Sequence, residues 1–216
     1  MNRIMVTDLF DTSKVYFNEL FDGVLYPWSA LSKIDDFISA FDKREYREYA
    51  KGVYIGEGVE IHPSAVIIAP VIIGRGSVIR PSAYIRGSVI IGENCVVGNS
   101  TEIKNSILFN NVQVPHYNYV GDSLLGNFSH LGAGTICSNL KADGKSVVVR
   151  DREGIDTGRR KLGAILGDYA NVGCNCVLNP GTVIGKNTAV YPALSIRGIL
   201  PPNSIVKSNE NIVDRK

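Results

Sequence analysis

His116 is the residue whose type and surroundings could do acid–base chemistry. It lies in the short segment Pro115-His116-Tyr117, with Tyr119 three residues further on. A histidine placed in a turn beside a surface groove can act as a general base near neutral pH. Taken alone, a loop histidine is more often a solvated side chain. The elements around it therefore have to decide between the two interpretations.

The segment interrupts a six-residue repeat. An apolar residue returns at every sixth position, and a small or β-branched residue stands two positions before most of them. The apolar set is Ile55, Ile61, Ile67, Ile73, Ile79, Ile85, Ile91, Val97, Ile103 and Phe109. Neither a helix nor an alternating strand has this period, whereas hexapeptide repeats form a parallel β-helix. We predict an all-β chain built on a left-handed parallel β-helix, whose aliphatic residues point inward and stack.

The repeat continues beyond the interruption. The first array runs from about 53 to 112, and the phase returns at Leu125, Leu131 and Cys137. A basic, non-repetitive insert follows at about 141–162, and the array resumes from Leu166 to Ile196. At about 18 residues per coil, the repeats amount to roughly seven coils. We assign residues 53–207 to the β-helix.

The first 52 residues lack the six-residue period. Leu31, Ile34, Ile38 and Phe41 instead recur at helical spacing. The prediction is a small helical N-terminal cap over residues 1–52 that covers the open end of the coil, since an open end exposes unpaired strand edges. Residues 208–216 are polar and are predicted to be a frayed tail.

Composition excludes several classes of protein. The 216 residues carry a net charge of +2 and 44% hydrophobic residues, which gives no reason to expect nucleic acid or a membrane surface as partner. We expect no signal peptide, no membrane span and no metal, since the four cysteines include no CxxC pair. A cytoplasmic protein with reduced thiols is predicted.

The stretch VPHYNYVGDSLLGNFSHLGAGTICSNLKADGK resembles the acetyltransferase half of the bacterial bifunctional N-acetylglucosamine-1-phosphate uridyltransferases. It is also similar to the related archaeal sugar-1-phosphate acetyltransferase/nucleotidyltransferase proteins. The resemblance spans about 54–207. It implies a homotrimer that transfers acetyl from acetyl-CoA to the amine of glucosamine 1-phosphate or galactosamine 1-phosphate, for nucleotide-sugar synthesis.

The resemblance also implies roles for individual residues. His116 matches the general base, and the backbone N–H of Ala133 matches a group close to the reacting carbonyl, in oxyanion position. The residues that match substrate-binding positions are Arg86, Lys104, Tyr119, Asn139 and Lys145. A sugar phosphate is a dianion near pH 7, so Arg86 and Lys104 would supply charge-assisted hydrogen bonds.

The cofactor side matches less well. Cys174 and Pro192 stand where the family lines the CoA groove, so side-chain contacts cannot be carried over there. Arg159, Arg160 or Lys161 of the insert could meet the phosphates of CoA, or the insert could be a solvated loop. The glycine-rich nucleotide-binding sequence of the bifunctional relatives is not found in this chain.

Alternatives stay open at this level. Arg86 and Lys104 could be ordinary outward charges on a coil. The protein could also be a non-catalytic sugar-phosphate-binding or scaffold trimer. A zinc-dependent carbonic anhydrase on the same fold would need three converging histidines, and the spacing of His62, His116 and His130 does not favour it.

Overall fold

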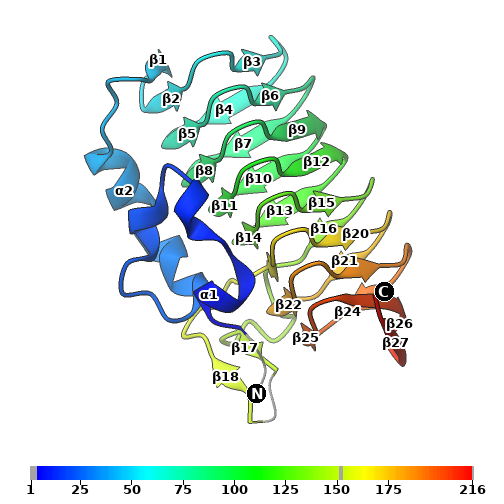
Figure 1. Cartoon of the computed structure of the whole chain (residues 1–216). Helices are drawn as coiled ribbons and strands as arrows, with labels where there is room; N and C mark the ends of the chain where they lie inside the picture. The colour runs from blue at the N-terminus through cyan, green and yellow to red at the C-terminus, as the bar shows by residue number, and fades with distance from the viewer. Residues whose placement is uncertain (1–3, 151–152, 216) are drawn as a thin grey trace.

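The computed structural model describes residues 4–150 and 153–215, and its main body is a left-handed parallel β-helix of three sheets (Figure 1). In sheet A and in sheet B, eight of the nine described strands run parallel. The molecule therefore has about eight coils, one more than the repeat count predicted. The fold class predicted from the repeat is confirmed.

The strands are short because each occupies one face of a coil. Sheet A holds β1 (Arg47–Ala50), β2 (Val53–Ile55), β5 (Val71–Ile73), β8 (Val89–Ile91), β11 (Ser106–Leu108), β14 (Leu124–Leu125), β19 (Ala164–Leu166), β22 (Thr182–Ile184) and β25 (Ile199–Leu200). Sheet B holds β3 (Glu60–Ile61), β6 (Val78–Ile79), β9 (Val96–Asn99), β12 (Gln113–His116), β15 (His130–Leu131), β20 (Asn171–Val172), β23 (Ala189–Val190), β26 (Ser204–Ser208) and β27 (Asn211–Asp214). Sheet C holds β4 (Val66–Ile68), β7 (Tyr84–Arg86), β10 (Glu102–Lys104), β13 (Tyr119–Gly121), β16 (Ile136–Cys137), β21 (Val177–Leu178) and β24 (Ser195–Ile196).

The inward rows predicted from the repeat are buried. In sheet C the row passes through Ile85, Ile103, Val120, Cys137 and Leu178, all fully buried. Stacking identical faces lets each aliphatic side chain contact those of the coils on either side, and this continuous burial supplies the stability of a solenoid.

The phase slips earlier than the sequence suggested. Leu108 pairs with Ile91, whereas a full coil would have placed Phe109 there. Phe109 therefore occupies the corner where the neighbouring coils have Gly92 and Gly126 after their inward residue. Its ring stacks on Phe10, with centroids 4.6 Å apart. The assignment of Phe109 to the inward row was wrong, because one residue is missing from the preceding corner.

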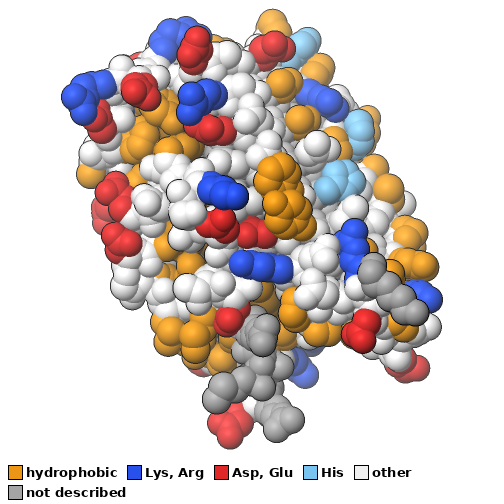
Figure 2. All heavy atoms as spheres, viewed as in Figure 1, with side chains coloured by type: hydrophobic (Ala, Val, Ile, Leu, Met, Phe, Trp, Pro, Cys, Tyr) orange, Lys and Arg blue, Asp and Glu red, His pale blue; other side chains and the backbone are white. Residues whose placement is uncertain are grey.

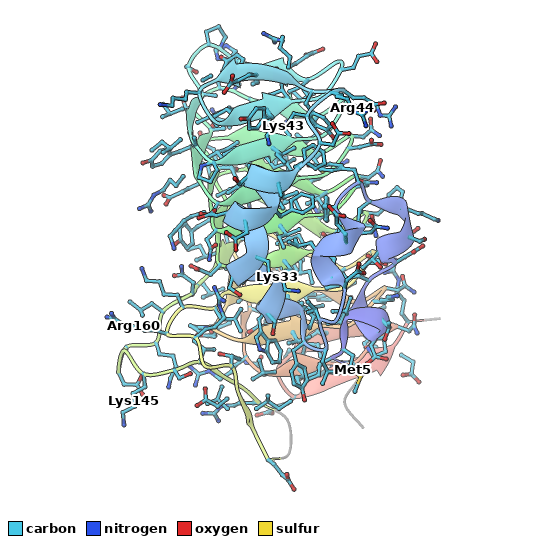
Figure 3. The ribbon with its side chains drawn as sticks, turned by 90° about the vertical axis from the view of Figure 1, so that its left-hand side faces the viewer. Met5, Lys33, Lys43, Arg44, Lys145 and Arg160 are labelled. Atoms are coloured by element: carbon cyan, nitrogen blue, oxygen red, sulfur yellow. The ribbon has the colours of Figure 1, made fainter. Side chains whose placement is uncertain are left out.

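The N-terminal segment lies along the side of the prism, against sheet A, and not over the open end (Figures 1 and 3). It contains two short α-helices and three 3-10 helices: α1 (Val6–Leu9), η1 (Thr12–Lys14), η2 (Asn18–Phe21), η3 (Pro27–Lys33) and α2 (Ile34–Ala40). The outward residues of sheet A are apolar and need a cover, as Ile72, Ile90 and Ile107 show by being fully buried. The N-terminal segment therefore covers the apolar face of sheet A and not the end of the coil, where β1 pairs antiparallel with β2.

Two other segments differ from the expected loops. The insert after β16 carries an antiparallel hairpin of β17 (Val148–Val149) and β18 (Ile155–Asp156). The predicted frayed tail forms β27, which pairs antiparallel with β26. No helix within the described residues is long and apolar enough to cross a membrane.

Candidate active site

Arg86, Lys104 and Tyr119 lie together on the outer face of sheet C. The strands β7, β10 and β13 are neighbours, and Tyr119 pairs with Glu102, which in turn pairs with Tyr84. Arg86 and Lys104 stand two positions after Tyr84 and Glu102, so they point outward on the same side of the sheet. Three successive coils therefore present two cations and a phenol on one surface.

Both cations are paired with carboxylates. Arg86 Nη1 lies 2.7 Å from Glu102 Oε1, and Lys104 Nζ lies 3.1 Å from Asp122 Oδ2. The hydrogen bond with Glu102 raises the pKa of Arg86 above its ordinary value. Exposure separates the two pairs, because the Asp122 side chain is only 4% exposed whereas that of Glu102 is 32% exposed.

Asp122 connects several of the predicted site residues. Besides Lys104, its carboxylate accepts hydrogen bonds from the side-chain amides of Asn105 and Asn139. Asn139 Nδ2 also donates to the hydroxyl oxygen of Tyr119, at 3.2 Å. Burial raises the pKa of Tyr119, so this hydroxyl remains protonated at neutral pH. Asp122 thus fixes one edge of sheet C, where β10 and β13 end.

His116 lies at the opposite edge of sheet C, where the chain turns from β12 toward β13. It is exposed, and its partner in the preceding coil is Asn99. A Cβ added to Gly98 would come within 1.6 Å of the Pro115 carbonyl oxygen. Only glycine allows the Pro115 carbonyl to approach so closely. The positive φ of 50° at Tyr117 then turns the chain sharply after His116.

Asn118 holds this turn from beneath. It is 2% exposed, accepts a hydrogen bond from His116 N, and donates to the carbonyl oxygen of Gly132 in the next coil. An amide that accepts on one side and donates on the other joins the two coils at this edge. The imidazole of His116 is thereby positioned by backbone contacts and remains open to the surface.

The predicted oxyanion and CoA residues stack on the same edge as His116. Gly134 N donates to His116 O at 3.0 Å, Asn175 N to Ala133 O at 2.8 Å, and Ala193 N to Cys174 O at 2.8 Å. Ala133, Cys174 and Pro192 therefore follow His116 in successive coils. Cys174 and Pro192 are exposed. Within the described residues, the Ala133 N–H donates to no protein acceptor.

The insert residues divide between two environments. Figure 3 shows Lys145 and Arg160 projecting from the insert away from the coils, and both are exposed. Lys145 is therefore not brought to Asp122 or His116 within one chain. Arg159 is half-buried, and it lines a surface hollow together with Asp122 and Lys161. Burial lowers the pKa of Arg159, and the charge of Asp122 opposes that shift.

Asp122 and Asn118 were given no role from the sequence. Both belong to the PHYNYVGD motif, and their burial is the signal that only the structure supplies. The other two histidines lie outside these edges. His62 contacts Ser64, and His130 contacts Asn171 on the outer face of sheet B, the side on which histidines are visible in Figure 2.

Among the described residues, no group of three or more His, Cys, Asp or Glu side chains could hold a metal ion. One edge of sheet C offers the imidazole of His116 and the backbone N–H of Ala133, which has no protein acceptor among the described residues. The other edge offers the Lys104 ammonium, paired with the buried Asp122 carboxylate.

Comparisons with known proteins find similarity over part of the chain. The family model for the GMPPB C-terminal domain matches residues 67–159. A bifunctional protein GlmU of Methanococcus maripaludis is 36% identical over 110 residues, which cover 50% of this chain and 27% of the relative. A bifunctional sugar-1-phosphate nucleotidylyltransferase/acetyltransferase of Sulfurisphaera tokodaii is 42% identical over 81 residues, 37% of this chain and 20% of the relative. The matches thus span about a quarter of the length of these relatives.

Solved structures add only a general likeness. The Arabidopsis UDP-N-acetylglucosamine acyltransferase has a TM-score of 0.49 at 12% identity, over 76% of this chain and 65% of that one. The acetyltransferase domain of PglB from Neisseria gonorrhoeae has a TM-score of 0.41 at 18% identity, over 75% and 57%. Similarity at this level does not assign a function.

The sequence relatives are the more informative comparison, since they are 36% and 42% identical to this chain over 110 and 81 residues. Over that part, the chain is similar to the bifunctional GlmU and sugar-1-phosphate nucleotidylyltransferase/acetyltransferase proteins, of whose length the matches span 27% and 20%.

Proposed function

We propose that this protein is an N-acetyltransferase that transfers the acetyl group of acetyl-CoA to the amine of a hexosamine 1-phosphate, either glucosamine 1-phosphate or galactosamine 1-phosphate. The observation that carries the proposal is that different functional groups lie at the two edges of sheet C. His116 and the free N–H of Ala133 lie at one edge, and Lys104 and Asn139 meet on Asp122 at the other.

The distance between the two edges suits the acceptor. Each strand of sheet C is two or three residues wide, which corresponds to about 7–10 Å at roughly 3.3 Å per residue. The amine of a hexosamine 1-phosphate stands on C2, adjacent to the carbon that carries the phosphate. With a hydrogen bond of about 3 Å at each end, a phosphate near Lys104 and an amine near His116 can bridge this distance.

His116 would act as the general base. The acceptor's ammonium group must lose a proton before its nitrogen can attack a thioester, and the imidazole of His116 accepts that proton. The new C–N bond forms as the C–S bond breaks, His116 returns its proton to the departing sulfur, and the second proton that the nitrogen must lose passes to water. Such a base typically contributes about 10²–10⁴-fold to the rate.

Ala133 would stabilise the developing charge. Its backbone N–H, without a protein acceptor among the described residues, can donate to the thioester oxygen as negative charge builds there. Bound acetyl-CoA supplies the activated acetyl group. The exposed Cys174 and Pro192 extend the same edge for two further coils, which is where we place the donor.

A homotrimer is part of the proposal. Sheet A is already covered by the N-terminal segment, whereas sheet C carries the exposed apolar residues Val66, Ile68 and Ile136, which are 54%, 46% and 40% exposed. Packing of this face against a second copy would bury them and bring Lys145 of a neighbour toward the site. The four cysteines are unpaired, which fits the cytoplasmic location predicted from the sequence.

The test is thiol release from acetyl-CoA by the purified protein, with glucosamine 1-phosphate, galactosamine 1-phosphate and unphosphorylated glucosamine in parallel. We expect release that requires the phosphorylated sugar and falls by about 10²-fold or more in His116→Ala. His62→Ala is the matched control, because His62 is also exposed but contacts only Ser64. It should keep full activity.

Two results would contradict the proposal. Absence of release with either sugar phosphate, from a folded protein, favours the non-catalytic binding or scaffold function. Equal activity on glucosamine and its 1-phosphate would remove the phosphate site from the mechanism.

A further inference from the structure

The two predicted phosphate ligands are neutralised within the chain. Arg86 is paired with Glu102, and Lys104 with Asp122. Two cations and two carboxylates leave this surface with no net charge. A phosphate dianion gains little from such a surface, because the carboxylates repel it about as strongly as the cations attract it. A further cation is needed for the site to attract an anion.

Arg159 is positioned to supply that cation. It lines the surface hollow that also includes Asp122, Arg160 and Lys161, and it is half-buried there whereas the other two cations are exposed. Its Nε is buried and, within the described residues, has no hydrogen-bond partner. A buried guanidinium N–H without an acceptor is costly. A phosphate oxygen that entered the hollow would satisfy it.

The backbone of the insert holds Arg159 in this position. Val147 N donates to Arg159 O at 2.8 Å, and Arg159 N donates to Thr157 Oγ1 at 3.2 Å. The chain then returns to the coil at the site itself, where Leu162 N donates to Asn139 O and Gly163 N to Asp122 O. The insert is thus hydrogen-bonded to Asp122, which pairs with Lys104, and to Asn139, which donates to Asp122.

We propose that Arg159 is a ligand for the acceptor's phosphate group, carried by the insert to the edge of sheet C where Lys104, Asn139 and Asp122 meet. This inference rests on the proposed function. It replaces the expectation that Arg159 binds CoA, because Cys174 and Pro192 lie at the other edge of the sheet. It gives the insert a role in acceptor recognition, and it makes a phosphorylated acceptor the preferred class of substrate.

Steady-state kinetics with both substrates varied separate the acceptor from the donor. In Arg159→Ala we expect the KM for the hexosamine 1-phosphate to rise about tenfold or more, since one hydrogen bond between charged groups is lost. The KM for acetyl-CoA should stay unchanged. Arg159→Lys should recover part of the lost affinity for the acceptor, because lysine restores the positive charge but not the paired N–H donors of the guanidinium. Arg150→Ala is the matched control, because Arg150 is exposed on the same insert but lines a different surface hollow.

A rise in the KM for acetyl-CoA instead, or an equal rise in the KM for the hexosamine 1-phosphate in Arg150→Ala, would overturn the inference. A second measurement is independent of catalysis: calorimetric titration of the wild-type protein and Arg159→Ala with hexosamine 1-phosphate and with inorganic phosphate, without acetyl-CoA. Weaker binding by Arg159→Ala supports the anion site, whether or not the wild-type protein transfers acetyl. Absence of acetyl transfer by the wild-type protein would refute only the proposed function. Equal binding by both proteins refutes the anion site itself.

Discussion

Replacement of Asp122 by alanine tests whether this carboxylate organises the site. Its side chain is 4% exposed, pairs with Lys104, and accepts from Asn105 and Asn139. Breaking a buried ion pair on one side typically costs about 3–5 kcal/mol. Lys104 is 24% exposed and can be rehydrated, so the lower part of that range applies. We expect Asp122→Ala to lower the free energy of unfolding by about 3–4 kcal/mol.

The assay is urea unfolding at fixed protein concentration, because assembly would make the midpoint depend on concentration. The slope should remain that of the wild-type protein while the midpoint falls. Asp42→Ala is the control, since Asp42 pairs with Arg44 on an exposed surface, and its midpoint should not move. A double-mutant cycle with Lys104→Met isolates the pair.

Two outcomes would refute the reasoning about Asp122. One is an unfolding free energy of Asp122→Ala within about 1 kcal/mol of the wild-type value, well below the loss expected for a buried pair. The other is additivity of the Asp122→Ala and Lys104→Met changes, which would mean that the two side chains do not stabilise each other in solution.

Two further predictions concern other parts of the chain. A thiol reagent should modify Cys174 rapidly in the native protein and spare Cys95 and Cys137, because these two are buried and burial raises their pKa values to about 12. Acetyl-CoA should protect Cys174 from the reagent. Unchanged labelling of Cys174 at saturating acetyl-CoA would mean that the donor binds elsewhere. Burial raises the pKa of Asp168 in the folded protein above the value of about 3.8 that applies in the unfolded chain. Protonation of Asp168 therefore stabilises the folded state. This contribution is complete below the unfolded pKa and is lost as the pH rises through the folded pKa. The unfolding free energy of the wild-type protein relative to Asp168→Asn should therefore fall from pH 3.5 toward pH 7, and urea midpoints showing the opposite trend would contradict this sign.

The candidate site was predictable in part, and the reason lies in the repeat. Arg86 and Lys104 each follow an inward residue directly, so the period alone places them on one outer face. Tyr119 precedes its inward residue, Val120, and lies after the shortened corner, so the period alone does not place it. His116 was noticed because the period was interpreted as breaking there, although the shortened corner comes before Ser106. Asp122 could not be found in this way, since its importance comes from burial against Lys104 and Asn139, and burial of a corner residue depends on what covers it.

Arg159 shows the limit more sharply. The insert has no period, so its sequence gives no register against the coils. Its place beside Asp122 is decided by hydrogen bonds between the returning chain and residues of two different coils, Gly163 N to Asp122 O and Leu162 N to Asn139 O. Contacts of this kind join residues whose separation along the chain follows no rule.

The amino-acid sequence by itself determined the β-helix, the rows that fill it and the outer face that carries the site, because stacked coils repeat one local rule of inward and outward positions. The tertiary structure decided where the non-repeating parts lie. Phe109 does not lie in the predicted inward row but stacks on Phe10. The N-terminal segment lies along sheet A and not over the end of the coil. The physical reason is that apolar surface on sheet A needed a cover, and only the assembled prism presents that surface.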